Sequence, residues 1–143
     1  MALRMSGQCL CGKVRFSARP EPTMHACHCS LCRRFSGGVF LVADCGQTVA
    51  IEEGENSLTW FSSSDWAERG FCGKCGASLF WRGKEDRRVF ASIQSFEQPC
   101  DFEFRNEIFI DSKPANYAFA NHTTQVTEAE FLASLAGEEG AKP

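Results

Sequence analysis

Three cysteines fall within six residues of the chain, in the run Cys27-His28-Cys29-Ser30-Leu31-Cys32. The packing of an apolar core does not require that density of thiols, whereas a metal ion that prefers sulfur does. The 143 residues include nine cysteines, and the other six are Cys9, Cys11, Cys45, Cys72, Cys75 and Cys100. Because nine is an odd number and seven of the nine are clustered, we interpret the clusters as metal ligands rather than as a disulfide framework.

Composition narrows the class of protein. The formal net charge of −3 argues against a nucleic-acid partner, which usually meets a basic face. No apolar run is long enough for a membrane span, and residues 1–8 lack the hydrophobic segment of a signal peptide. We therefore expect a cytoplasmic protein with reduced thiols and no membrane partner. The length predicts a single domain over residues 1–143, with a core at about 6–120.

Short apolar or alternating segments separated by turn residues predict a mainly β domain with little helix. The expected extended segments are residues 13–18, 23–29, 39–43, 48–52, 58–61, 88–96 and 102–110. Residues 30–35 are predicted to form one helical turn with Ser30 as its N-cap. Thr127 and Glu130 have the spacing of a capping box and predict a short C-terminal helix, with Phe131 on its apolar face. Residues 137–143 are predicted to be a frayed tail.

The spacing Cys72-x-x-Cys75-Gly76 is typical of a zinc knuckle, in which a tight turn directs two sulfurs at one ion. Cys9 and Cys11 can supply two more ligands, because residues i and i+2 of a strand point to the same face. The four thiols together predict a closed, structural zinc site. The alternatives are a redox dithiol for Cys72 and Cys75, and a pair of small core residues for Cys9 and Cys11.

Cys27, Cys29 and Cys32 then form a separate set of three. Three protein ligands and one open position are the usual arrangement of catalytic zinc, which polarises carbonyl groups and lowers the pKa of a bound thiol or water. A distant acid or one of the histidines, His25, His28 and His122, could close this site instead. His28 is disfavoured as that ligand, because adjacent residues of an extended segment point to opposite faces.

Two arginines and two isolated cysteines complete the set of candidate residues. Arg33 and Arg34 directly follow the thiol run, where they could balance the excess negative charge of three thiolates or bind a substrate carboxylate. The alternative is a solvated helix face. Cys45 and Cys100 stand alone in the sequence, and we interpret both as buried thiols.

Three motifs together resemble one family. They are Gly7-x-Cys9-x-Cys11-Gly12-x-Val14-x-Phe16, Cys27-His28-Cys29-Ser30-x-Cys32-Arg33-Arg34 and Phe71-Cys72-x-x-Cys75-Gly76-x-x-Leu79. Their order, spacing and neighbours resemble the glutathione-dependent formaldehyde-activating family, which is also called centromere-protein-V-like. Residues 108–114 are similar to the C-terminal stretch of that family, so the resemblance covers roughly residues 6–120.

This resemblance implies an Mss4-like fold of antiparallel sheets organised around zinc. It implies a structural zinc on Cys9, Cys11, Cys72 and Cys75, and a catalytic zinc on Cys27, Cys29 and Cys32. It also implies a carbon–sulfur lyase that acts on the adduct of a small thiol and a carbonyl compound, as in S-(hydroxymethyl)glutathione synthesis. Two other functions remain open on the same fold: a non-enzymatic zinc module that binds a protein, and a redox or zinc-storage protein.

Overall fold

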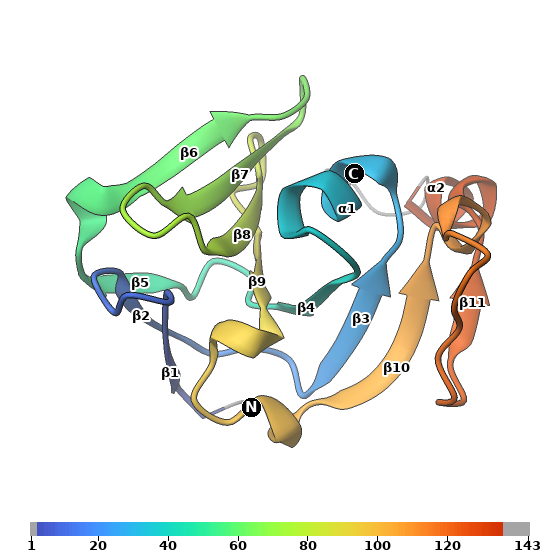
Figure 1. Ribbon diagram of the computed structural model, residues 1–143, viewed down its shortest axis with the longest axis horizontal. Helices are drawn as coiled ribbons and strands as arrows, with labels where there is room; N and C mark the ends of the chain where they lie inside the picture. The colour runs from blue at the N-terminus through green and yellow to red at the C-terminus, as the bar shows by residue number, and fades with distance from the viewer. Residues whose placement is uncertain (1–2, 136–143) are drawn as a thin grey trace.

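The computed structural model describes residues 3–135, and the mainly β prediction is confirmed (Figure 1). A small sheet contains β1 (Met5–Gln8), β2 (Arg15–Ala18) and β5 (Ala50–Glu53). A larger sheet contains β3 (Thr23–Cys27), β4 (Phe40–Asp44), β6 (Leu58–Ser62), β7 (Ala67–Cys72), β8 (Ser78–Gly83), β9 (Val89–Ser92), β10 (Glu103–Ile108) and β11 (Thr124–Val126). The two α-helices are α1 (Ser30–Ser36) and α2 (Glu128–Leu135).

The larger sheet has the strand order β11-β10-β3-β4-β9-β8-β7-β6. From β3 through to β6, the neighbouring strands are antiparallel. Strand β10 departs from the expected antiparallel arrangement, because it pairs in parallel with both β3 and β11. The departure has a topological cause: the preceding strand β9 pairs with β4, so the chain must pass β4 and β3 to reach the far side of β3 and cannot pair through a hairpin.

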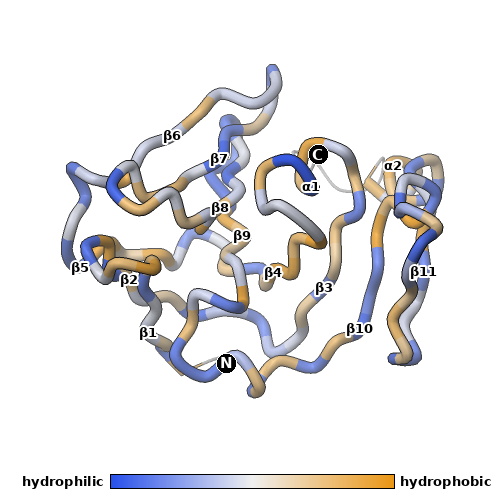
Figure 2. Tube along the Cα trace, in the orientation of Figure 1, coloured by the Kyte–Doolittle hydropathy of each residue, from blue (hydrophilic) through white to orange (hydrophobic). Residues whose placement is uncertain are grey.

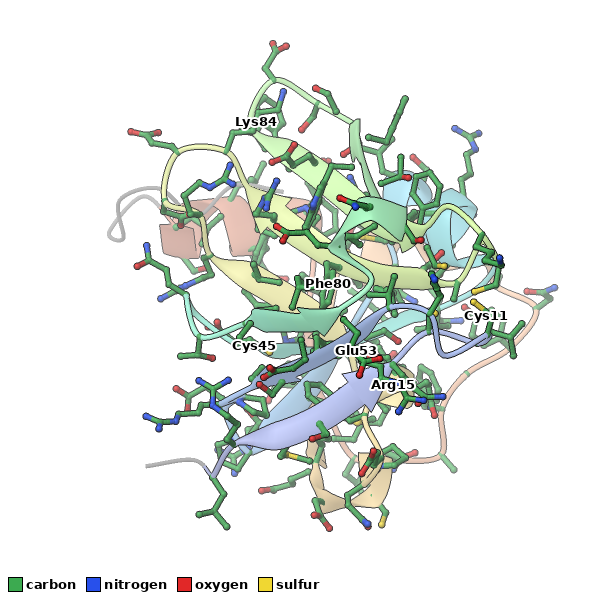
Figure 3. All side chains as sticks on the ribbon, turned by 90° about the vertical axis from the view of Figure 1, so that its left-hand side faces the viewer. Cys11, Arg15, Cys45, Glu53, Phe80 and Lys84 are labelled. Atoms are coloured by element: carbon green, nitrogen blue, oxygen red, sulfur yellow. The ribbon has the colours of Figure 1, made fainter. Side chains whose placement is uncertain are left out.

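The main core lies between the two sheets. Phe16 of β2 meets Phe80 of β8 edge to face, with ring centroids 4.9 Å apart. Both rings are buried, and Figure 3 shows Phe80 enclosed among the strands while Lys84 lies at the periphery. Edge-to-face pairs of this kind add about 1 kcal/mol to the free energy gained by burying the rings. This contact therefore fastens the small sheet to the large one.

The two faces of the large sheet serve different clusters. Successive side chains of a strand point to opposite faces. In β4, Leu41 and Ala43 pack against the main core, whereas Phe40 and Val42 pack in a second cluster that includes Cys27. Figure 2 shows β4 as a hydrophobic stretch in the middle of the molecule. The alternation thus places the thiols of residues 27–32 on the opposite face from the main core.

Both helices begin with identifiable caps. Cys29, rather than the predicted Ser30, is the N-cap of α1: its Sγ accepts a hydrogen bond from the backbone N–H of Cys32. The predicted capping box before α2 is confirmed, because Thr127 and Glu130 exchange hydrogen bonds of 3.0 and 3.1 Å. The predicted tail lies outside the described residues. Within residues 3–135, no helix has both the length and the hydropathy needed to cross a bilayer.

Candidate metal centres

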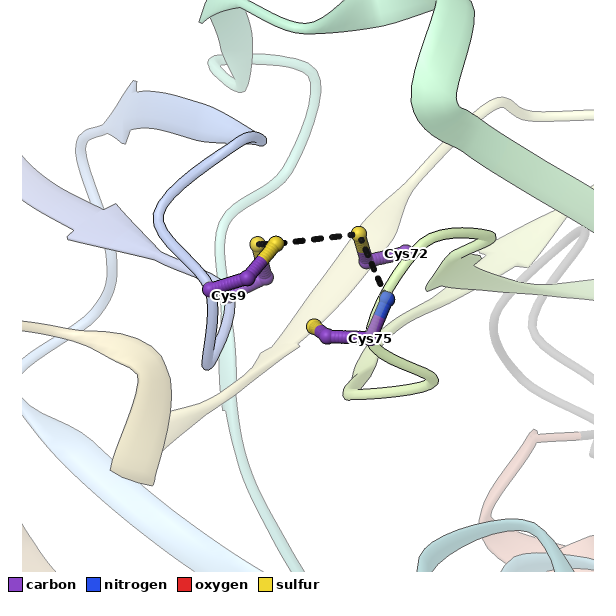
Figure 4. A group of neighbouring side chains, drawn as sticks. Cys9, Cys72 and Cys75 are labelled. Carbon is purple, nitrogen blue, oxygen red and sulfur yellow. Dashed lines mark hydrogen bonds between the residues drawn. The ribbon is translucent and has the colours of Figure 1, made fainter.

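The sulfurs of Cys9, Cys11, Cys72 and Cys75 form one cluster, with all four within 4.8 Å of one another (Figure 4). The Sγ atoms of Cys9 and Cys11 are 3.7 Å apart, and those of Cys11 and Cys72 are 3.9 Å apart. A tetrahedron with metal–sulfur bonds of about 2.3 Å has sulfur–sulfur edges of about 3.8 Å. The spacing therefore suits a metal ion with four thiolate ligands.

Two similar turns hold these sulfurs. After each cysteine pair a glycine has a left-handed backbone: Gly12 has a φ of 77° and Gly76 a φ of 79°. Cys72 Sγ accepts a hydrogen bond from the backbone N–H of Cys75, and Cys9 Sγ accepts one from Val14. Backbone donors of this kind stabilise negative charge on metal-bound thiolates. The local sequence therefore forms two halves of one site, which meet only in the folded chain.

The four cysteines of this cluster differ in how far they are buried. Cys9 and Cys72 are buried, whereas Cys11 is exposed and Figure 3 places it at the edge of the molecule. Exposure of Cys11 contradicts the alternative that Cys9 and Cys11 are both small core residues. The pKa of Cys75 is lowered to about 6, chiefly by the hydrogen bond from the backbone N–H of Ala77. A thiol with that pKa is already a ready metal ligand at neutral pH.

Cys27, Cys29 and Cys32 form the second cluster, with their sulfurs also within 4.8 Å of one another. Cys27 ends β3, Cys29 caps α1, and Cys32 lies in the first turn of that helix. The chain reversal between strand and helix brings the three together without help from distant segments. Among residues 3–135, no fourth cysteine, histidine or carboxylate joins the group. These three side chains could hold a metal ion with one position open.

A buried arginine lies against this cluster. Nη2 of Arg69, on β7, donates a 3.2 Å hydrogen bond to Sγ of Cys32, and Nη1 donates to Oγ of Ser63 at 2.6 Å. The side chain is only 3% exposed, so its charge is weakly screened. The pKa of Cys29 is lowered to about 2 by hydrogen bonds from Cys27 and Cys32, with the charge of Arg69 contributing. The environment therefore favours the thiolate form of Cys29, whereas the hydrogen bond with Cys29 and burial raise the pKa values of Cys27 and Cys32.

His28 points away from the three sulfurs, as predicted. It is fully buried, and its Nε2 lies 2.8 Å from Oε1 of Glu107, on β10. The other carboxylate oxygen of Glu107 accepts hydrogen bonds from Thr123 at 2.6 Å and from Gln125 at 3.4 Å. The backbone N–H of His28 also donates to the carbonyl of Ile108. This network fastens the cysteine run to the β10–β11 edge of the sheet.

A pocket of about 80 Å³ opens beside the second cluster. Its lining consists of the three cysteines, seven apolar side chains and four polar ones, which are Cys27, Cys29, Cys32, Phe40, Val42, Trp81, Phe90, Ile108, Phe109, Phe131, His25, Arg69, Asp86 and Arg88. Strand register explains the lining: Arg69 is opposite Trp81, which is opposite Phe90, so one row of the sheet forms the floor. The arrangement can present a small molecule to the sulfurs.

The two arginines expected to orient a substrate do not line this pocket. Nε of Arg33 donates a 3.0 Å hydrogen bond to the carbonyl of His28, so its guanidinium braces the cysteine run. Arg34 lines a different depression, next to Gly37 and Ala77. The pocket instead contains Arg69, which the sequence analysis did not single out. In the sequence, Arg69 is distinguished only as a charged residue in the short segment before Cys72.

The remaining histidines and cysteines are also placed. His25 lines the pocket, and burial lowers its pKa to about 4, whereas His122 is exposed and lies outside it. Cys45 is buried as predicted, and burial raises its pKa to about 12. The buried-thiol interpretation of Cys100 is wrong: it is exposed, in a short 3-10 turn, Pro99–Asp101, beside β10.

Comparison with known proteins gives a consistent result. A family model described as glutathione-dependent formaldehyde-activating enzyme matches residues 4–112. A protein of Schizosaccharomyces pombe named as an uncharacterized lyase is 33% identical over 131 residues, which are 90% of this chain and 95% of that protein. The crystal structure of a Rhodobacter sphaeroides protein has a TM-score of 0.58 and 22% identity, and covers 70% of this chain and 99% of that one. This structural likeness supports the fold alone.

Proposed function

Because the chain belongs to the glutathione-dependent formaldehyde-activating enzyme family, we propose that it is a zinc-dependent carbon–sulfur lyase. Its substrate would be the adduct of a small thiol and a carbonyl compound. One observation carries the proposal: within residues 3–135 the Cys27–Cys32 cluster has three sulfurs and borders a pocket, whereas the other cluster has four. A three-ligand set beside a cavity is the arrangement used for catalysis.

Zinc is the metal that fits both clusters best. All the candidate ligands are cysteine sulfurs, and soft thiolates select zinc, copper(I) or iron–sulfur clusters over the hard cations. Cys9, Cys11, Cys72 and Cys75 would hold the structural ion, and Cys27, Cys29 and Cys32 the catalytic one. When bound at the second site, zinc supplies Lewis acidity that lowers the pKa of a thiol or polarises a carbonyl group.

The proposed reaction is redox-neutral. The substrate thiol loses its proton, and its sulfur forms a bond to the carbonyl carbon. The electron pair of the carbon–oxygen π bond moves to oxygen, which takes up a proton, and the product is a hemithioacetal. The lyase direction breaks the same carbon–sulfur bond and returns both partners.

The side chains around the pocket would assist in two ways. Arg69 provides a positive charge next to Cys32, and in a site with little water this charge favours sulfur in its anionic form. Trp81, Phe90 and Phe131 provide walls that exclude water from the reacting groups. Both contributions come from residues fixed by the sheet or by α2 and do not require a loop to close.

The direct test mixes zinc-loaded protein with formaldehyde and a thiol and follows adduct formation by NMR exchange spectroscopy. Glutathione and small apolar thiols should be compared, with an uncatalysed sample at each concentration because the reaction is spontaneous. We expect acceleration for at least one thiol. If no thiol reacts faster than in the uncatalysed sample, the lyase proposal is wrong, and a non-enzymatic zinc module becomes the better interpretation.

Two serine variants test which cluster is catalytic and which is structural. Cys29→Ser should keep the fold and one zinc ion per chain but lose the acceleration. Cys72→Ser should lose the structural ion and lower the melting temperature strongly, since metal binding at a closed site contributes directly to folding. Zinc content by mass spectrometry and melting by circular dichroism separate the two results. Equal loss of fold in both variants would contradict the division into structural and catalytic sites.

A further inference from the structure

We propose that the pocket beside Cys27, Cys29 and Cys32 selects a small thiol with an uncharged, apolar body, and that a charged tripeptide is a poor occupant. This proposal rests on the lyase function, because it names the substrate class of the same site. Three features of the pocket carry it: its size, its walls and its charge balance.

The size of the pocket limits its occupant to a few non-hydrogen atoms. Its volume is about 80 Å³, whereas apolar protein cavities that bind benzene have about 150 Å³. Phe109 and Phe131 narrow it on the side of β10 and α2, with ring centroids 5.5 Å apart. A short alkyl thiol fits inside these walls. A tripeptide could place only its thiol end there and would leave the rest of its length outside.

Most of the wall is aromatic or aliphatic. Trp81 and Phe90 meet edge to face at 5.5 Å, and Phe40, Val42 and Ile108 extend the same apolar surface. Surface of this kind binds hydrocarbon by removing it from water, at about 25 cal/mol for each Å². These apolar side chains offer no hydrogen-bond partner to a peptide group. An amide buried here would lose its contacts with water without replacement.

The charges of the pocket are already paired. Three thiolates, one divalent ion and the guanidinium of Arg69 together carry no net charge. Arg69 is committed to Cys32 and Ser63. Arg88, at the edge of the pocket, lies 3.7 Å from the carboxylate of Asp44, and its own backbone N–H donates to Asp86. A carboxylate carried into the pocket would therefore meet a buried cation, Arg69, that already contacts sulfur, and desolvating its own charge among apolar walls would be costly.

Isothermal titration calorimetry on the zinc-loaded protein tests this inference without measuring activity. Butanethiol and mercaptopropionate have similar length and differ in one charged group, and glutathione adds size to charge. We expect butanethiol to bind at least about ten-fold more tightly than either of the others. Equal or tighter binding of mercaptopropionate would overturn the charge argument, and equal or tighter binding of glutathione would overturn the size argument.

A matched pair of variants locates the selectivity. Phe131→Ala removes one wall, and Phe61→Ala removes a ring that is 64% exposed and lies outside the pocket. We expect Phe131→Ala to weaken butanethiol binding about ten-fold and to narrow its advantage over glutathione, while Phe61→Ala changes neither. An unchanged preference in Phe131→Ala contradicts a selective role for this wall. The wild-type series remains decisive if that variant proves unstable.

The outcomes of the binding experiment and of the kinetic experiment can be told apart. If small thiols bind selectively but no adduct forms faster than in solution, the lyase proposal is wrong and the selectivity stands. If adduct formation is accelerated but glutathione binds as well as butanethiol, the enzyme is a lyase and the substrate class inferred here is wrong.

Discussion

Nη2 of Arg69 lies 3.2 Å from Sγ of Cys32, so a cation on β7 is in contact with a thiol on α1. Both residues line the pocket, and they are 37 positions apart in the chain. Arg69 is nearly inaccessible to solvent, and among the described residues its Nε has no hydrogen-bond partner. Holding a buried charge this way is costly unless it compensates a negative charge nearby. The thiolate of Cys29, whose pKa is lowered, provides such a charge.

Replacing this arginine should loosen metal binding at the second cluster. Arg69→Met keeps much of the side-chain length but removes the charge and the hydrogen-bond donors. We expect zinc to leave the second cluster about 10–100-fold more readily, because groups that contact ligands typically contribute this much to affinity. Competition with a coloured chelator measures the change. Arg69→Lys should recover part of the affinity, and Arg15→Met, at an arginine half exposed to solvent, should behave as wild type. Unchanged release from Arg69→Met would contradict the role.

The lowered pKa of Glu107 predicts how the stability of the fold depends on pH. Burial raises the pKa of its carboxyl, but hydrogen bonds from Thr123, His28 and Gln125 outweigh burial and hold the pKa below the ordinary value of about 4.5. A carboxyl whose pKa is lowered by folding stabilises the native state above that ordinary value. Its contribution is lost as the pH falls through the native pKa.

We therefore expect Glu107→Gln to lower the free energy of unfolding at neutral pH by about 1–3 kcal/mol, the usual size for a hydrogen bond to a charged group. The difference from wild type should shrink as the pH falls below about 4.5. Urea titrations at several pH values measure it, with Glu103→Gln as the control because Glu103 is exposed on the same strand. A difference that stays constant over this range would show that the charge is not the cause.

Gly54 and Gly37 form a matched pair for backbone strain. Both have left-handed backbones, with φ of 79° and 78°. A Cβ at Gly54 would overlap with the carbonyl oxygen of Lys13, whereas a Cβ at Gly37 would meet nothing within 4 Å. Gly37→Ala should therefore cost about 1–2 kcal/mol, the price of the left-handed conformation alone. Gly54→Ala should cost clearly more, as measured by thermal or urea unfolding. Equal losses of stability in the two variants would mean that the backbone at Lys13 shifts to make room for the added Cβ.

Alkylation should distinguish the nine cysteines. In the zinc-loaded protein, Cys100 is exposed and belongs to neither cluster, so a maleimide should modify it first. Cys45 is buried, and its raised pKa keeps it in the unreactive thiol form. A chelator should then expose Cys11 to the reagent, because it is the exposed member of the first cluster. Mass spectrometry of the peptides gives the order, and early modification of Cys11 with zinc present would contradict its role as a ligand.

The sequence predicted the two cysteine groups because their spacing is local or follows a recurrent turn. Cys72 and Cys75 are directed by a single turn, and Cys27, Cys29 and Cys32 by one strand-to-helix reversal. The pattern of apolar and alternating residues also predicted five of the eight strands of the larger sheet, which are β3, β4, β6, β9 and β10, but not β7 or β8. It could not predict the three-residue strand Thr124–Val126, which contains little apolar pattern and is held by its parallel pairing with β10.

The residues around the clusters were harder to predict. Periodicity assigns a side chain to a face of a sheet but does not identify the strands that will lie beside it. Arg69 meets Cys32, and Glu107 meets His28, only because β7 and β10 take particular places in the sheet order. Proximity in sequence favoured Arg33 and Arg34 instead. Neither arginine lines the pocket, and Arg33 instead donates a hydrogen bond to the backbone carbonyl of His28.

The two clusters differ in when they can first form during synthesis. The second cluster is contained in one short segment and is complete once Cys32 has emerged from the ribosome. The first joins Cys9 and Cys11 to Cys72 and Cys75, so it must wait for a much later part of the chain. A nascent chain thus offers three clustered thiols before the four-cysteine cluster exists. The positions of the cysteines in the chain therefore fix the order in which the two sets of thiols become available.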